Sequence, residues 1–533
     1  MIGNSFSEYI FIRVCIFLLQ YTTPICLSCV AVLVAIRGPP ALFHPISKFL
    51  LGYSLADLIY AVFIYIPYNR RLKEETNHPP PLSRAERKAF IQRCLAHMPN
   101  TEQYLRMWFL GADASEIRRE NLRDFLLWAF FDRRPGLESE EDDAELDEYV
   151  ALVEHSLGRK LEPGRGRAEG LRLTLDEAET RYRSVIWYLI IGVVDALTHC
   201  QLALSGFEYH AQPRSGVLSV IPHRLQNLTA SRRSASPDLS YWYRPHTAKG
   251  KLPVVFLHGI GVGLWAYVQF LSGLNKRTRG DEQIGIIAVE YLPVSSRLTG
   301  APLPKADFLK QVTAILASHG WDNFVLASHS YGSVLATHMF QSETLGPRIE
   351  SAVLIDPVTI LLHLPNVAYN FTRRKPRRAN EWLLWYFASM DPGVAHCLAR
   401  HFFWKENIVW KEDLVNATRE PARGNGLVAG SSTAERKRRV AVVLAEYDLI
   451  VDTLSVAQYL AGDGEWRLTS TMFKHSSPGK TTSHRSPGGG HLTDDGIELL
   501  WFPGLDHAQV FDVKESRQRL CSVLQRYCDK WTT

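Results

Sequence analysis

The serine at position 330 stands at a junction between two patterns. An apolar, β-prone run covers residues 324–328, and a sequence typical of a helix covers 333–339. A strand that passes into a helix through one residue needs a tight, strained turn, which presents that residue's side chain above the end of the sheet. The free N–H groups of the helix then point at the atom that the side chain attacks. Ser330 is therefore a candidate nucleophile.

A nucleophilic hydroxyl needs a base, and the base needs a carboxylate that orients it. Residues 497–502 predict a short buried strand, and His507 lies in the loop after it. A further strand is predicted over 440–446, and Asp448 lies just beyond its end. We expect Asp448 to be the acid. Asp356, which ends the predicted strand 351–355, stays open as an alternative acid or as the cap of an Asp-Pro turn, and Asp452 is a weaker third candidate.

Donors for a developing oxyanion are also present. The predicted strand 253–257 runs into the turn His-Gly-Ile-Gly-Val-Gly at 258–263. The backbone N–H groups of Ile260 and Tyr331 are the expected oxyanion hole. His258 and His329 flank these motifs, and we expect each of them to make local hydrogen bonds.

Together these motifs resemble the α/β-hydrolase superfamily, in its branch with an HGxGxG turn and a serine nucleophile, whose chain order is Ser, Asp, His. The resemblance covers residues from about 215, and we place the domain at 206–533. It implies a mostly parallel eight-stranded sheet with helices on both faces and a lid inserted after the sixth strand. One departure is Ser328, which occupies a position where the superfamily usually has glycine.

No metal and no organic cofactor is expected for this chemistry. The eight cysteines are scattered, without a CxxC pair or a zinc-like Cys/His spacing outside an apolar run. A net charge of +5 and the lack of an aromatic-basic motif argue against nucleic acid as a partner.

The first 75 residues predict a transmembrane hairpin. Residues 14–36 carry no charge and are long enough to cross about 30 Å of hydrocarbon as a helix. A second apolar run, 49–68, contains Asp57 and is followed by Arg70, Arg71 and Lys73. Basic residues after a span favour the cytosolic side, so we expect an integral membrane protein with a cytosolic hydrolase domain.

The remaining segments are predicted more coarsely. Residues 76–205 form a mainly helical region of unassigned role, which ends in an apolar helix near 185–204 that is either interfacial or a third span. The lid is expected at 359–436 and is rich in aromatic residues at 382–387, 402–404 and 410. A Ser/Pro/Gly-rich insertion at 474–494 is expected to be flexible.

We interpret the chain as a membrane-anchored serine hydrolase whose substrate is an apolar acyl ester, lipids included. A thioesterase, an amidase or a C–C hydrolase would use the same residues. A non-catalytic membrane scaffold that keeps the fold is the alternative from another class.

Overall fold

The computed structural model describes residues 3–136, 139–275, 282–417, 437–462 and 490–530. The insertion predicted to be flexible at 474–494 lies outside the described residues up to position 489, as does the part of the expected lid after position 417.

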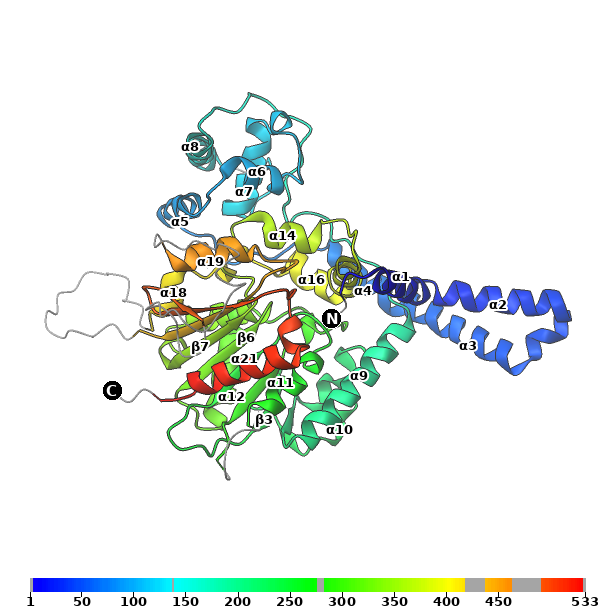
Figure 1. The fold of residues 1–533 in the computed structure, drawn as a ribbon. Helices are drawn as coiled ribbons and strands as arrows, with labels where there is room; N and C mark the ends of the chain where they lie inside the picture. Colours follow the sequence, from blue (N-terminus) through cyan, green and yellow to red (C-terminus); the bar gives the residue numbers. More distant parts are fainter. Residues whose placement is uncertain (1–2, 137–138, 276–281, 418–436, 463–489, 531–533) are drawn as a thin grey trace.

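A twisted sheet forms the centre of the molecule (Figure 1). Its strand order is β2-β1-β3-β5-β4-β6-β7-β8-β10-β9, and the pairs from β5 to β10 are parallel. Its eight longer described strands match the predicted eight-stranded sheet, and two-residue strands extend each edge. The strands are β1 (Glu208–Ala211), β2 (Arg232–Arg233), β3 (Ser240–Arg244), β4 (Val254–Leu257), β5 (Ile286–Glu290), β6 (Phe324–His329), β7 (Ile349–Ile355), β8 (Arg439–Ala445), β9 (His491–Leu492) and β10 (Ile497–Phe502).

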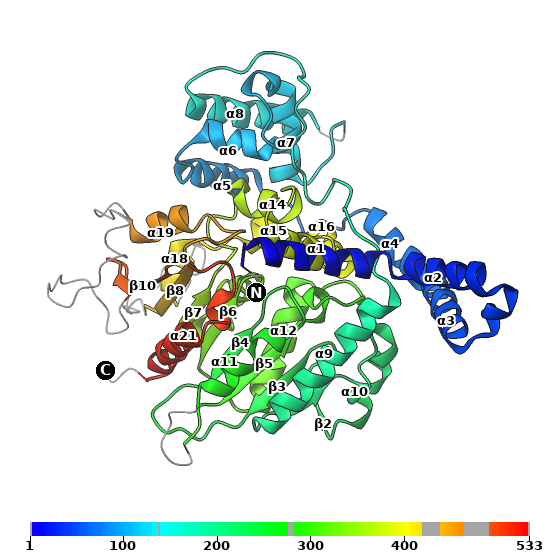
Figure 2. The same cartoon turned by 45° about the vertical axis from the view of Figure 1, so that its right-hand side comes forward.

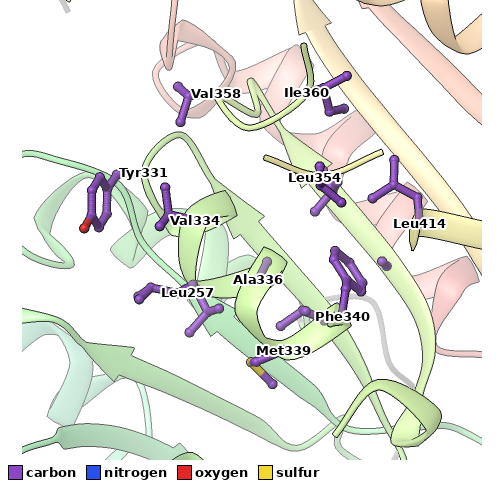
Figure 3. Packing of buried hydrophobic residues seen from close by; sticks show 14 of the residues in the cluster. Leu257, Tyr331, Val334, Ala336, Met339, Phe340, Leu354, Val358, Ile360 and Leu414 are labelled. Atoms are coloured by element: carbon purple, nitrogen blue, oxygen red, sulfur yellow. The ribbon is translucent and has the colours of Figure 1, made fainter. Parts of the chain in front are cut away.

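Both faces of the sheet are covered, which is why the central strands are continuously apolar. Val254 and Phe256 of β4 pack on the side of α11 (Val268–Gly273) and α21 (Lys514–Tyr527). Val255 and Leu257 face the opposite side, where three helices pack. These are α12 (Lys305–Ser318), α13 (Gly332–Phe340) and α19 (Thr453–Ala461). Figure 3 shows Leu257 beside α13, whose Val334, Ala336 and Met339 form part of this core.

The lid follows β7, the sixth of the longer strands, as the resemblance implies. Its described elements are α14 (Pro365–Thr372), α15 (Ala379–Leu384), the π-helix η9 (Trp385–Ser389), α16 (Pro392–Arg400), α17 (Trp404–Asn407) and α18 (Lys411–Val415). Above the lid lies a four-helix unit with its own apolar core (Figures 1 and 2). It consists of α5 (Arg84–Ala96), α6 (Thr101–Trp108), α7 (Arg119–Phe131) and α8 (Glu140–Leu157).

The first apolar run does not form the single helix predicted over 14–36. It is divided into α1 (Phe6–Gln20) and α2 (Thr22–Arg37), whose axes differ by 74°. Pro24 explains the break, because a proline clashes with the carbonyl four residues earlier, here that of Gln20, and cannot donate to it. Helix α1 packs on α15 of the lid, whereas α2 pairs with α3 (Pro45–Tyr60) in a hairpin that projects from the body (Figure 2).

The projecting hairpin and α9 (Val185–Leu204) both expose apolar faces. Phe43, Phe49 and Leu55 are exposed around the hairpin, and Leu189 and Val193 are exposed one turn apart on α9. Two helices, one over 45–73 and α9, are long and apolar enough to cross a membrane, and the bent pair α1 and α2 would make a third span if it is one unit.

The carboxylates inside these apolar segments have partners. Asp57 of α3 accepts hydrogen bonds from the Thr23 hydroxyl (2.6 Å) and from the backbone N–H of Val185 (2.8 Å), so it caps the start of α9. Asp195, in the middle of α9, pairs with Arg224 (3.2 Å) and Arg297 (3.0 Å) of the hydrolase domain. One face of α9 is thus fixed to the protein, and the other face remains apolar.

Candidate active site

Ser330 occupies the sharp turn between β6 and α13. Its φ is +51°, in the left-handed region that non-glycine residues rarely adopt. Two glycines make this geometry possible, because a Cβ on Gly332 would lie 2.2 Å from the carbonyl oxygen of Leu257, and one on Gly259 would lie 2.8 Å from Cβ of Ser330. Ser328, where the superfamily usually has glycine, is completely buried, so the turn forms with a serine there.

The three predicted triad residues lie in one hydrogen-bonded chain. His507 Nε2 is 2.8 Å from Ser330 Oγ, and His507 Nδ1 is 2.7 Å from Asp448 Oδ2. The other oxygen of Asp448 accepts from the backbone N–H groups of Ile450 (2.7 Å) and Val451 (2.9 Å). Because these two donors fix the carboxylate, it holds the imidazole in the tautomer whose Nε2 accepts the serine proton.

Burial lowers the pKa of His507, but the adjacent Asp448 carboxylate outweighs this effect and raises the pKa to about 9. Asp356 and Asp506 act in the same direction from a greater distance. A raised pKa means that the imidazolium formed during proton transfer is strongly stabilised, and that the neutral base is most abundant under alkaline conditions.

The alternative acid Asp356 lies at the same site without touching the histidine. Its oxygens accept from the backbone N–H groups of Ala445 (3.1 Å) and Ala508 (2.9 Å), and burial raises the pKa of its carboxyl. Asp356 therefore ties the loops that carry Asp448 and His507 to the end of β7. Asp452 instead caps α19, because its side chain accepts from the backbone N–H of Ser455 (3.1 Å).

Asp506, which was not among the predicted site residues, lies on the other side of the base. One oxygen accepts from the backbone N–H groups of Leu449 (3.0 Å) and His507 (2.7 Å), and the other accepts from Nδ2 of the lid residue Asn380 (2.7 Å). Asp506 thus couples the histidine loop to the first turn of α15. Its position beside His507 was the only signal in the sequence.

Both backbone groups expected to form the oxyanion hole are unengaged. The N–H groups of Ile260 and Tyr331 donate to no acceptor within the residues that the structure describes. Their neighbours are occupied, since Gly259 donates to the Tyr267 hydroxyl (3.1 Å) and Gly261 to the carbonyl of Val294 (3.1 Å). Ile260 and Tyr331 also line the same cavity as Ser330, which leaves two donors beside the nucleophile.

The histidines that flank the motifs make local hydrogen bonds. Nε2 of His258 accepts from the backbone N–H of Tyr291 (2.9 Å), and Nδ1 of His329 lies 2.8 Å from the Tyr267 hydroxyl. Burial lowers the pKa of both imidazoles, so they are neutral and they brace the two turns.

A cavity of about 60 Å³ opens beside Ser330 and is almost entirely apolar. Lid residues form much of it, and they include Phe371 of α14 and Phe402. The other aromatic group of the lid, at 382–387, packs against α1 instead. Trp382 stacks under the guanidinium of Arg13 in α1 (3.8 Å), and Tyr386 belongs to an apolar cluster with Ile12 and Ile16 of the same helix. Of the lid's aromatic residues, Phe371, Phe402 and Trp404 therefore line the cavity, and the group at 382–387 does not.

Two residues of the four-helix unit also line this cavity, although the sequence assigned no role to that region. They are Trp108 of α6 and Trp128 of α7, and Trp404 of the lid lies beside them. Each is an ordinary core residue in its local helical pattern, so no local signal distinguishes it. Only the packing of the unit on the lid brings these rings to the site.

A metal ion is the other species that this carboxylate and histidine cluster could hold. Ligand atoms of Asp356, Asp448 and His507 lie within 4.8 Å of one another. The facing oxygens and nitrogens are, however, already hydrogen-bonded to each other or to backbone N–H groups. The arrangement suits proton transfer, and within the described residues no other group of three such side chains is close enough to bind a metal.

Residues 254–499 match the sequence profile described as "Alpha/beta hydrolase family". No curated protein sequence matches the chain significantly. Similar solved structures include a bacterial membrane phospholipase A (11% identity, 65% of this chain and 94% of that chain, TM-score 0.36). Others are carboxylesterase CesB from Bacillus subtilis (12% identity, 63% of this chain and 98% of that chain, TM-score 0.31) and a putative lipase from Acinetobacter baumannii (9% identity, 63% of this chain and 96% of that chain, TM-score 0.36). At these TM-scores the likenesses carry no argument about substrate.

Proposed function

Because residues 254–499 of this chain belong to the alpha/beta hydrolase family, we propose that the protein is a membrane-anchored serine hydrolase that cleaves an apolar carboxylic ester. The observation that carries the proposal is the hydrogen-bonded chain from Ser330 through His507 to Asp448 at the mouth of an apolar cavity. Hydroxyl, base and acid are in the order and at the distances that acyl transfer requires.

The reaction would proceed in two stages. His507 Nε2 removes the proton from Ser330 Oγ as the oxygen attacks the ester carbonyl carbon, and Asp448 stabilises the imidazolium. The tetrahedral intermediate collapses to an acyl-serine while the imidazolium gives its proton to the departing alcohol. Water then attacks the acyl-serine, with His507 as base again, and the carboxylic acid is released.

The N–H groups of Ile260 and Tyr331 are placed to hold the negative charge on the carbonyl oxygen. One such donor typically contributes about 10²- to 10³-fold to turnover. Both donors come from the backbone of turns whose close approach depends on glycine, so this part of the site is insensitive to most side-chain changes.

A thioester, an amide or an activated carbon–carbon bond would pass through the same steps, so the ester assignment rests on the cavity. Its apolar walls offer an acyl group shape and burial but few polar groups to recognise a charged one. A scaffold without catalysis would have no need of a strained serine at φ +51° beside two backbone N–H groups that donate to no acceptor in the described parts of the chain.

Membrane attachment would come from the hairpin of α2 and α3. Its exposed apolar side chains have no protein cover among the described residues, and an apolar surface of this extent is stable only against lipid or another protein. We expect the full-length protein to remain in the membrane pellet after alkaline carbonate treatment and to be released by detergent. Release by carbonate alone would contradict the anchor.

The activity is tested by labelling the detergent-solubilised protein with a short fluorophosphonate probe. Wild-type protein should be labelled, and Ser330→Ala and His507→Ala should not. Ser333→Ala is the matched control, because Ser333 lies in the same turn and its hydroxyl bonds the carbonyl of Ser330 rather than His507. A folded wild type that takes no label would favour the scaffold instead.

A further inference from the structure

Two apolar cavities share three indole rings in their walls. The near cavity contains Ser330. The far cavity, of about 70 Å³, lies within the four-helix unit. Trp108, Trp128 and Trp404 line both. We propose that the four-helix unit is the receptor for the substrate's acyl chain, which runs from Ser330 past these rings into the far cavity, and that it therefore sets chain-length specificity. This inference rests on the proposed function and specifies its substrate as a medium-length aliphatic acyl ester.

The walls of the far cavity fit a hydrocarbon chain. They are mostly Leu, Ile, Phe and Trp from α5, α6 and α7, and α8 adds Val153. Its few polar side chains carry no charge. The Thr101 hydroxyl is 2.6 Å from that of Ser156, and His363 is uncharged because burial lowers its pKa to about 4, with Nε2 3.4 Å from the carbonyl of His97 and Nδ1 without a partner among the described residues. An apolar cavity of this kind stays free of water, and the binding of an apolar ligand in it is favourable.

The volumes give an approximate chain length. An engineered cavity of about 150 Å³ holds one benzene ring. The near cavity, at about 60 Å³, suits an acetyl-sized group, whereas both cavities together have slightly less volume than that engineered cavity and suit a chain of about five or six carbons. A substrate that uses only the near cavity would leave the space in the four-helix unit without a role.

Of the three indole rings that the cavities share, two are held by hydrogen bonds of their N–H groups and one is not. Trp128 donates its indole N–H to the Thr174 hydroxyl (2.9 Å), and Trp404 donates to the carbonyl of Ala129 (3.1 Å). The indole of Trp108 makes no hydrogen bond within the described chain, so its rotation breaks none. Trp108 is therefore the ring we expect to move as the chain passes.

Helix α8 offers a matched pair of variants. Val153 lines the far cavity, whereas Val150, one turn earlier and also buried in the core of the unit, does not. The test measures kcat/KM for p-nitrophenyl esters of two to sixteen carbons with the detergent-solubilised full chain. For wild type we expect kcat/KM to rise from the acetyl ester to about the hexanoyl ester. In Val153→Phe the hexanoyl-to-acetyl ratio should fall by about tenfold with the acetyl rate retained, and in Val150→Phe the ratio should stay within about twofold.

A wild-type experiment keeps the test independent of whether these variants fold. An alkyl fluorophosphonate with a six-carbon chain and a terminal diazirine would be attached to Ser330 and irradiated. Cross-links in peptides from α5, α6, α7 or α8 are expected. Cross-links confined to the lid or to solvent, or a hexanoyl-to-acetyl ratio equally affected by both valine variants, would overturn the inference while labelling by the short probe leaves the serine hydrolase intact.

Discussion

The site around Ser330 has two walls that are built in different ways. The sheet domain contributes a polar wall, in which each important group is fixed by backbone hydrogen bonds, as Asp448 is by the N–H groups of Ile450 and Val451. The four-helix unit and the lid contribute an apolar wall of side chains such as Trp108 and Phe402 that only fill space. The first wall should determine whether any ester reacts, and the second which ester reacts.

Replacing the acid should have the largest effect and should act on all substrates alike. In Asp448→Asn the amide oxygen keeps the two backbone donors, so the NH2 group faces Nδ1 and donates to it. The imidazole then carries its proton on Nε2, which can no longer act as the base, and kcat should fall by about 10⁴. The measurement is kcat for acetyl and octanoyl esters. Asp452→Asn is the control, because Asp452 only caps α19. A loss confined to the longer ester would contradict the division between the walls.

The backbone part of the polar wall can be tested through Gly259. Its added Cβ in Gly259→Ala would lie 2.8 Å from Cβ of Ser330, so the turn that carries the Ile260 N–H must move. Displacing one oxyanion donor should lower kcat by about 10² to 10³. Gly273→Ala is a suitable control, since its added Cβ meets only Sγ of Cys521 at an ordinary 3.5 Å. Equal kcat values for the two variants would remove Ile260 from the oxyanion hole.

The same contrast explains what the sequence could predict. The turn at Ser330 and the strand ends before Asp448 and His507 are local patterns, and a strand end fixes the position of the next residue within a few ångströms. The sequence therefore sufficed to predict that Ser330, Asp448 and His507 lie at one edge of the sheet. The sequence favoured Asp448 but left Asp356 open as an alternative acid, because both follow parallel strands. The 2.7 Å contact with His507 distinguishes Asp448 from Asp356.

The apolar wall could not be predicted, because it depends on contacts between segments far apart in the chain. Trp128 and Trp404 are 276 positions apart and line the same cavity. The break at Tyr21 is different, since Pro24 was a local signal that the uninterrupted apolar run obscured. Periodicity and hydropathy indicate which residues are buried, but not which unit they are buried against.

A change in the apolar wall should affect stability more than chemistry. In Thr174→Val the buried indole N–H of Trp128 loses its acceptor, at a cost of about 1–3 kcal/mol in the free energy of unfolding. Thr313→Val is the control, because that hydroxyl bonds only a carbonyl of its own helix. Denaturant titration should show the difference, while kcat for the acetyl ester should stay within about threefold. A large loss of acetyl-ester turnover would mean that the two walls are not independent.

The smallest effect should come from the second carboxylate of the polar wall, and it should appear mainly in the pH profile. The base must be neutral to act, so the acidic limb of kcat/KM follows the pKa of His507, which lies above the ordinary histidine value, at about 9. The charge of Asp356 contributes to that increase. Asp356→Asn removes the charge, lowers the pKa of His507 and should move the acidic limb to lower pH.

Asp506→Asn checks the direction of this pH shift independently, because Asp506 also raises the pKa of His507. The acidic limb of its pH profile should also move to lower pH. In both variants the plateau value of kcat/KM should stay within about tenfold of wild type, since neither carboxylate accepts a hydrogen bond from the imidazole. A limb that moves to higher pH in either variant would contradict this account. A plateau that falls as far as in Asp448→Asn would instead make Asp356 a second orienting acid, and the polar wall would then hold its base between two carboxylates rather than against one.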